Sequence, residues 1–198
     1  MQLGRDGKAD VLLVNARAGE DRFVEEGYAE MRCDVMYNDF LIVGPGGGVF
    51  SQNLNLEQTL IYIYEYALPF VSRGDDSGTH IKELQLWEAL EYVPEENSGY
   101  ISAGQGMGAT LGMAAELEAF TLTDRAAWLT YPDAGNLTIV CEGDEQLLNP
   151  YGVMAVSSSP FPDGAQAFID WILSPDAQWM ISWYGAEDFG QPLFCVYD

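Results

Sequence analysis

A short strand, a turn rich in glycine and hydroxyl side chains, and a helix recur three times in the middle of this chain. The first copy contains PFVSRGDDSGTH (residues 69–80), the second YISAGQGMGATLGMA (100–114) and the third FTLTDRAAWL (120–129). Alternating strands and helices are typical of α/β proteins. The apolar run VLLV at 11–14, bounded by polar residues, also fits a strand buried on both faces of a parallel sheet. We therefore expect an α/β fold.

Glycines mark a candidate boundary between two lobes. The strand predicted at 35–45 ends in Gly44-Pro45, and the glycines at 46–48 make a flexible joint. A second crossing strand is predicted at 149–160, where NPYGVMAVSSSP leads back.

These crossings give an expected domain layout. Residues 1–44 and 150–198 form lobe 1, and residues 45–149 form an inserted lobe 2 that carries SRGDDSGTH and GQGMGAT. Two lobes joined by two crossing segments make a cleft that can close around a ligand.

The charge of the chain excludes two classes of partner. It has 8 lysine and arginine residues against 31 aspartate and glutamate residues, and its formal net charge is −23. Nucleic acids and anionic membrane surfaces are bound through a basic face, so we expect neither as a partner. No apolar run in the sequence is long enough to span a membrane.

No pattern typical of an enzyme or a metal site is present. Cys33, Cys141 and Cys195 are far apart and His80 is the only histidine, so no metal-binding spacing arises. No nucleophile-elbow or zinc-protease motif occurs. We predict no catalytic residue, no metal ligand and no cofactor. A phosphate-ester hydrolase built on neighbouring aspartates is disfavoured, because adjacent ligands cannot fill a metal's coordination shell.

The first turn has the chemistry of an anion cradle. A helix that starts at Ser77-Gly78-Thr79 leaves backbone N–H groups unpaired, and its dipole favours negative charge. The Ser72, Ser77 and Thr79 hydroxyls add donors, and glycine lets the backbone approach a ligand closely. Arg73 offers a planar set of donors that matches the oxygens of a tetrahedral anion.

The neighbouring aspartates allow a simpler interpretation of this turn. Either Asp75 or Asp76 can cap the helix. The other can orient Arg73, or Arg73 can make an ordinary surface ion pair.

The other two turns supply weaker candidates. Gln105, Gly106 and Met107 precede or open the second helix, where the glycines serve either an anion or close packing. Arg125 opens the third helix, after Thr123 or Asp124 as its cap. Arg125 lies near the anion or neutralises an aspartate.

Motifs along nearly the whole chain resemble the tungstate-binding proteins of ABC-type importers, the TupA-type family. The resemblance is carried most specifically by PFVSRGDDSGTH and GQGMGATL, and is supported by ADVLLVNA, EEGY, DVMYNDFLIVGP, FTLTDRAAWL, EGDEQLLNPYGVMAV, AFIDWILSP and FGQPLF. It implies a two-lobed class II periplasmic-binding-protein fold. It also implies an extracytoplasmic receptor, periplasmic or anchored at the cell surface, that hands tungstate, sometimes molybdate, to a membrane permease.

The resemblance assigns half of the family's anion site to this chain. Ser72 and Arg73 match the serine and arginine of the family's SRGDxSG motif, and the ligand is expected in the cleft between the lobes. The family's other half-site, a turn of the form TTTS, is absent from these residues. The resemblance therefore implies a first lobe truncated at its N-terminus, and no signal peptide opens the chain. Two alternatives stay open: a receptor for phosphate or another oxyanion, and a truncated or degenerate copy that binds little.

Overall fold

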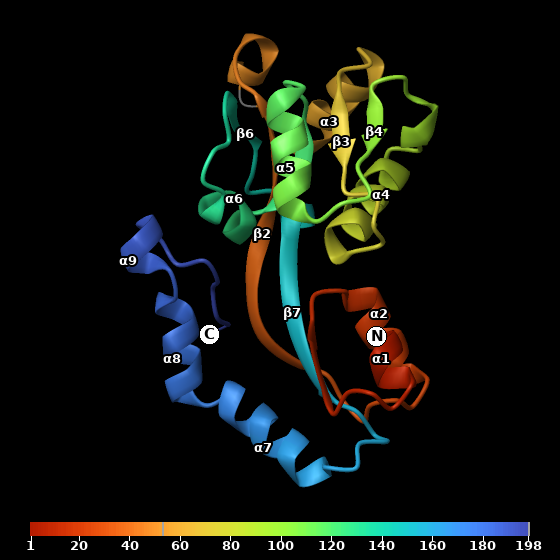
Figure 1. Cartoon of the computed structure of the whole chain (residues 1–198), viewed down its shortest axis with the longest axis vertical. Helices are drawn as coiled ribbons and strands as arrows, with labels where there is room; N and C mark the ends of the chain where they lie inside the picture. The colour runs from red at the N-terminus through yellow and green to blue at the C-terminus, as the bar shows by residue number, and fades with distance from the viewer. Residues whose placement is uncertain (53, 198) are drawn as a thin grey trace. The chain divides into compact units, whose positions relative to one another are not determined.

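The structure, a computed structural model, describes residues 1–52 and 54–197. The chain forms two compact units (Figure 1). Unit 1 comprises Met1–Asn38 and Asn149–Asp198, and unit 2 comprises Asp39–Leu148.

Unit 1 contains helices, strand β1, the first part of β2 and all but the first residue of β7. β2 (Cys33–Pro45) and β7 (Leu148–Ala155) run from one unit into the other. The remaining elements of unit 1 are α1 (Gln2–Arg5), β1 (Val11–Val14), α2 (Arg17–Glu25), α7 (Pro162–Ile172), α8 (Pro175–Trp183) and α9 (Ala186–Phe189).

The strand at 11–14 was predicted to lie in a parallel sheet, and this prediction is wrong. β1 pairs antiparallel with β7, with Val11 opposite Ala155 and Val14 opposite Gly152. β1 is the end strand in the order β1-β7-β2-β5, so it has only one neighbour, and Leu13 is 38% exposed. A continuous apolar run therefore does not by itself distinguish a central parallel strand from an antiparallel strand at the end of a sheet.

Unit 2 alternates strands and helices, as the recurring pattern predicts. Its elements are η1 (Gly48–Gln52), α3 (Leu56–Glu65), β3 (Phe70–Ser72), α4 (Gly78–Ala89), η2 (Pro94–Glu96), β4 (Tyr100–Ser102), α5 (Met107–Glu116), β5 (Thr121–Asp124), α6 (Arg125–Thr130), β6 (Leu137–Cys141) and η3 (Glu145–Leu147).

The sheet pairings of unit 2 bring the three strand–helix junctions together. β3 and β4 are parallel, and an isolated parallel bridge joins Phe70 of β3 to Phe120, which directly precedes β5. The N–H of Val71 also donates to the Phe120 carbonyl at 2.8 Å. The carboxyl ends of these strands therefore lie at one edge, where α4, α5 and α6 begin.

The boundaries between the two units lie at different residues from the predicted lobe boundaries. The predicted boundary after Gly44 falls inside β2, which continues to Pro45 and pairs there with β6. Gly44 serves packing, because a Cβ at this position would lie 2.2 Å from the Phe120 ring. The return boundary lies at 148/149.

The core of unit 2 lies between its helices and its sheet. A cluster of buried apolar side chains joins α3 and α4 to β3 and β5, and includes Leu56, Leu60, Ile63, Phe70, Trp87 and Phe120. A second cluster packs α5 against the other side of β3, through Val71, Leu111 and Ala114. These contacts fix the ends of β3 and β4, where the predicted site residues lie. Within the described residues no helix is long and apolar enough to cross a membrane.

Candidate functional site

The turns after β3 and β4 are joined backbone to backbone. Ser72 is the register partner of Ser102, and the N–H of Ala103 donates to the Ser72 carbonyl at 2.9 Å. One step further, the N–H of Gln105 donates to the Arg73 carbonyl at 3.2 Å. Figure 1 shows the two strands side by side within unit 2. The structure thus brings the first and second predicted turns together.

Gly74 allows this close approach. Its φ is +59°, in the left-handed region that favours glycine, and a Cβ at this position would lie 1.9 Å from the Ser102 Oγ. Ser102 is an exposed hydroxyl beside the first turn that the sequence analysis missed. Its position at the end of a predicted strand, like that of Ser72, could have indicated it as a site residue.

α4 begins in the way that the SGT segment predicts, but its cap differs from the prediction. Ser77 is the N-cap, and its Oγ accepts from the N–H of His80 at 3.4 Å. Neither aspartate caps the helix. Asp75 Oδ1 instead accepts from the N–H of Ser77 at 3.2 Å, one position before the helix. Gly78 and Thr79 follow as the first helical residues, and Thr79 is buried.

Asp75 also orients Arg73, which was the role expected for one of the two aspartates. Arg73 Nη2 donates to Asp75 Oδ2 at 2.5 Å. The Arg73 side chain is only 19% exposed, and its Nε is buried without a hydrogen-bond partner among the described residues. A buried donor without a partner costs about 1–3 kcal/mol, and an anion oxygen at this Nε would recover that cost.

Both oxygens of Asp75 are engaged by donors. Burial alone would raise the pKa of Asp75, but hydrogen bonds from Ser77 and Arg73 outweigh it and hold the pKa below its usual range. The carboxylate is therefore charged near neutral pH and acts on Arg73. The second aspartate, Asp76, has a fully exposed side chain, and its Oδ1 lies 3.7 Å from His80 Nδ1.

The second turn presents backbone donors without a side-chain cap. Gly106 is the N-cap of α5, and it has no side chain to pair with the first N–H groups of the helix. Met107 is the first helical residue, and the preceding Gln105 is exposed. The amide groups at Met107 and Gly108 are therefore available to a ligand, as expected for an anion-binding helix start.

Arg125 makes the contacts of an ion pair. Its Nε and Nη2 donate to the two oxygens of Asp39, each at 2.6 Å, and Nη2 also donates to Glu142 at 2.6 Å. The hydrogen bond with Asp39 is the main cause that raises the pKa of Arg125. Two roles were predicted for Arg125, near the anion or as the partner of an aspartate. These contacts fit the second role.

The Ser72 side chain is directed into unit 2. Ser72 is 1% exposed, and its Oγ accepts from the N–H of Gly74 at 3.2 Å. Burial raises the pKa of the Glu83 carboxyl of α4, and an interaction with Ser72 is among the effects that lower it. Ser72 therefore lies between the first turn and a buried carboxylate.

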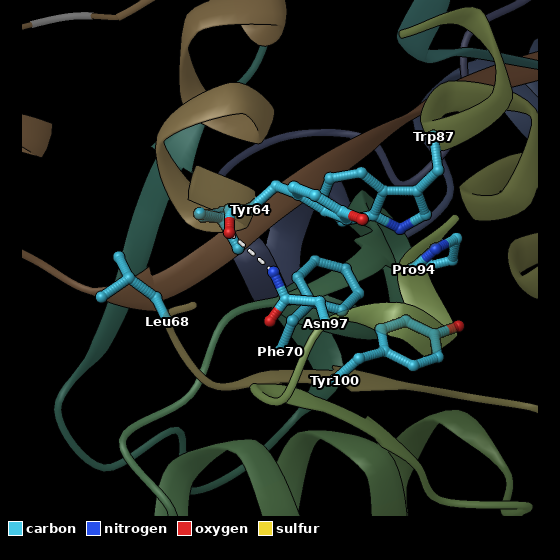
Figure 2. Close-up of a pocket in the computed structure, with 8 residues that line it drawn as sticks. Tyr64, Leu68, Phe70, Trp87, Pro94, Asn97 and Tyr100 are labelled. Carbon is cyan, nitrogen blue, oxygen red and sulfur yellow. Dashed lines mark hydrogen bonds between the residues drawn. The ribbon is translucent and has the colours of Figure 1, made fainter. Parts of the chain in front are cut away.

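The pocket in Figure 2 has the wrong chemistry for an anion. Aromatic and aliphatic side chains line it, including Tyr64, Phe70, Trp87 and Tyr100. Its one amide side chain is occupied, because Asn97 Nδ2 donates to the Tyr64 carbonyl at 2.6 Å. This pocket belongs to the apolar packing around α3 and α4.

No group of three His, Cys, Asp or Glu side chains in the described part of the chain is arranged to hold a metal ion. Cys33, Cys141 and Cys195 are free thiols.

Comparison with known proteins decides the family. A family model described as a PBP superfamily domain matches residues 1–176. A tungstate-binding protein TupA from Peptoclostridium acidaminophilum is 45% identical over 202 residues, which cover 98% of this chain and 70% of that protein. The chain belongs to the TupA family of the PBP superfamily. The resemblance predicted from the sequence motifs is thereby confirmed.

Solved structures agree with this TupA assignment. The tungstate-binding protein TupA from Desulfovibrio alaskensis G20 superposes with a TM-score of 0.83 at 35% identity, over 99% of this chain and 82% of that one. The tungstate ABC transporter structure from Geobacter sulfurreducens gives 0.79 at 42% identity, over 92% and 80%. The expected α/β fold of the periplasmic-binding-protein class is confirmed. These relatives are named as binding or transport proteins, not as enzymes.

Proposed function

We propose that this TupA-family chain is the extracytoplasmic binding protein of an ABC importer and that it binds tungstate at the turns after β3 and β4. The observation that carries the proposal is the hydrogen bonding and burial of the Arg73 guanidinium. Asp75 fixes its guanidinium on one side, and its buried Nε has no hydrogen-bond partner in the described part of the chain. An arginine held in this way can donate hydrogen bonds to the oxygens of an oxyanion.

The surrounding groups complete the proposed site. Backbone N–H groups at the start of α4 (Gly78 and Thr79) and of α5 (Met107) lie at the same edge of the sheet as Arg73. The Ser72 hydroxyl adds a donor once it turns from the interior toward the ligand. The names of two relatives, a tungstate-binding protein and a tungstate ABC transporter, support tungstate as the anion and the membrane permease of an ABC importer as the partner that we propose.

The roles of the two aspartates favour tungstate over phosphate. Tungstate is fully ionised near neutral pH, so it needs donors only, whereas protonated phosphate also needs an acceptor. Both oxygens of Asp75 are already engaged by Arg73 and Ser77, and the side chain of Asp76 is exposed. Molybdate has the same charge and shape as tungstate, and this reasoning applies to it equally.

Calorimetric titration with sodium tungstate tests the proposal. The wild-type chain should bind, and Arg73→Ala should weaken binding by about 10-fold to 100-fold, the value of one or more hydrogen bonds to a charged group. Arg22→Ala removes the same charge from an exposed position of α2 in unit 1 and should bind as the wild type does. Phosphate should compete poorly.

Three results would count against the proposal. Equal affinity of Arg73→Ala and wild type would remove the site assignment. No tungstate binding by a folded wild-type chain would favour the alternative of a copy that binds little. Tight phosphate binding would instead support the alternative oxyanion.

A further inference from the structure

Asp76, in the turn between β3 and α4, has a backbone conformation that is uncommon for residues other than glycine. Its φ is +57°, in the left-handed region. Three other non-glycine residues in the described part of the chain have a positive φ, and each directly follows the C-cap of a helix: Ala67, Glu91 and Glu118. Left-handed residues are common after helices. Asp76 precedes a helix instead, so its conformation has a different cause.

His80 supplies a contact that holds this conformation. Its Nδ1 accepts from the N–H of Asp76 at 3.1 Å, and its side chain is 13% exposed. The backbone N–H of His80 also donates to Ser77 Oγ at 3.4 Å. His80 is the third residue of α4, the position from which the side chain of a capping box returns to the backbone before the helix. His80 therefore joins the start of α4 to the turn through both its side chain and its backbone.

The contact is made to the backbone of Asp76 and not to its carboxylate. Asp76 Oδ1 lies 3.7 Å from His80 Nδ1, beyond hydrogen-bond distance, and the carboxylate is fully exposed. A charge pair with an exposed partner is worth little. A neutral imidazole, in contrast, accepts a hydrogen bond at the nitrogen that carries no proton. The Asp76 N–H is thus the group that His80 holds.

The held residue is next to the carboxylate that orients Arg73. Two left-handed residues, Gly74 and Asp76, flank Asp75. The backbone on both sides thereby sets the direction of the Asp75 carboxylate, which accepts from Arg73 Nη2 at 2.5 Å and from the N–H of Ser77 at 3.2 Å. Glycine takes the left-handed conformation readily, whereas aspartate does so at a cost in free energy. Loss of the acceptor that holds the turn should therefore let the turn change conformation and release Arg73.

We propose that His80 is a positioning residue of the oxyanion site: it holds the Asp76 amide so that Asp75 keeps the Arg73 guanidinium in place for the ligand. The proposal rests on the proposed function, because His80 acts on the anion through Arg73. When only a fraction of the molecules has the binding-competent turn, the apparent affinity falls by that fraction. His80 raises this fraction.

The tautomer of His80 tests the contact directly. His80 is the only histidine of the chain, so the NMR signals of histidine side-chain nitrogens come from one ring. At about pH 8, where a histidine side chain is ordinarily neutral, Nδ1 should carry no proton and Nε2 should carry one. A proton on Nδ1 would overturn the proposal, because that nitrogen could not accept from Asp76.

Variants of the full chain test the effect on tungstate affinity, measured by calorimetry. His80→Leu fills the space without an acceptor and should weaken binding by about 3-fold to 10-fold, the value of one hydrogen bond. His80→Asn offers Oδ1 as an acceptor near the position of Nδ1 and should stay within about twofold of the wild type. Equal weakening in His80→Leu and His80→Asn would assign the effect to packing and overturn the proposal.

Asp76→Asn is the matched control for charge. It removes the exposed carboxylate and keeps the backbone N–H, so it should not weaken tungstate binding. A loss equal to that in His80→Leu would assign the effect to the ion pair and overturn the role of the amide contact.

A double-mutant cycle separates positioning from a general loss of stability. Asp76→Gly takes the left-handed conformation without help, so His80→Leu should weaken tungstate binding less in this background than in the wild type. The same loss in both backgrounds would overturn the link through Asp76.

The outcomes also separate this inference from the proposed function. Tungstate binding by His80→Leu with wild-type affinity would overturn the role of His80 and leave the receptor function standing. Absence of binding by the folded wild type would overturn the proposed function, and with it this role.

Discussion

Substitution of Gly74 by alanine tests how tightly the two turns of the site are joined. The change adds one methyl group at a residue with φ +59°, and that methyl group would lie 1.9 Å from Ser102 Oγ and 3.4 Å from the backbone N of Gly104. Either the serine rotates or the two turns separate. The separation would move Arg73 away from the start of α5.

The expected cost has two parts. An alanine in the left-handed region costs about 1–2 kcal/mol relative to glycine. Crowding of a packed site adds about 1–3 kcal/mol, toward the lower end here because the Ser102 hydroxyl can rotate. Gly74→Ala should therefore lower the free energy of unfolding by about 2–4 kcal/mol, and it should weaken tungstate binding.

Gly104→Ala is the matched control for the backbone part. Gly104 also has φ +59°, but among the described residues, its two chain neighbours aside, no heavy atom would lie within 4 Å of a Cβ there. It should cost only about 1–2 kcal/mol. Urea unfolding followed by circular dichroism measures both variants against wild type.

A double-mutant cycle isolates the crowding. In a Ser102→Ala background the nearest clash is removed, so Gly74→Ala should cost about 1 kcal/mol less than it does in the wild type. Equal losses for Gly74→Ala and Gly104→Ala, together with no coupling to Ser102, would refute the conclusion that Gly74 is required for the close approach of the two turns.

Three other substitutions test the ion pairs and the buried acid. Arg125→Ala should lower the free energy of unfolding by about 1–3 kcal/mol, because Asp39 loses two short hydrogen bonds, and tungstate affinity measured by titration should stay near wild type; a large loss of affinity would place Arg125 in the site. Glu20→Gln should cost about 3 kcal/mol in urea unfolding, because it leaves the buried Arg32 charge without its buried partner; no loss would show that this pair contributes little. Because burial raises the pKa of Glu83 in the folded chain, the wild type should lose stability as the pH rises through that pKa, and Glu83→Gln should remove this dependence; identical pH profiles would contradict it.

The fold was predictable wherever local pattern and packing agree. In unit 2 each strand–turn–helix segment forms as predicted, because apolar runs, capping residues and glycines all favour the same local structure. In unit 1 the run at 11–14 forms a strand, but its apolar character did not reveal that β1 lies at the end of the sheet and pairs antiparallel. Register and neighbours depend on distant segments, which a local pattern does not report.

The sequence predicted the types of residue in the candidate site but not which of them the fold brings into contact. The sequence indicated Arg73 and a helix start, and one of the two aspartates as its orienting partner, and the structure selects Asp75. It missed Ser102, which becomes part of the site only through the pairing of β3 with β4. It gave no indication for Glu83, because a glutamate on a helix is usually exposed and only the tertiary fold buries it.

Anomalous diffraction tests the central claim most directly. Crystals of the wild-type chain grown with sodium tungstate, measured at a tungsten absorption edge, locate the metal atom without reference to any assigned ligand. Our account predicts one strong peak whose oxyanion oxygens contact the Arg73 guanidinium and the N–H groups that begin α4 and α5. A chain that binds tungstate in solution but shows its tungsten peak away from Arg73 would contradict the account.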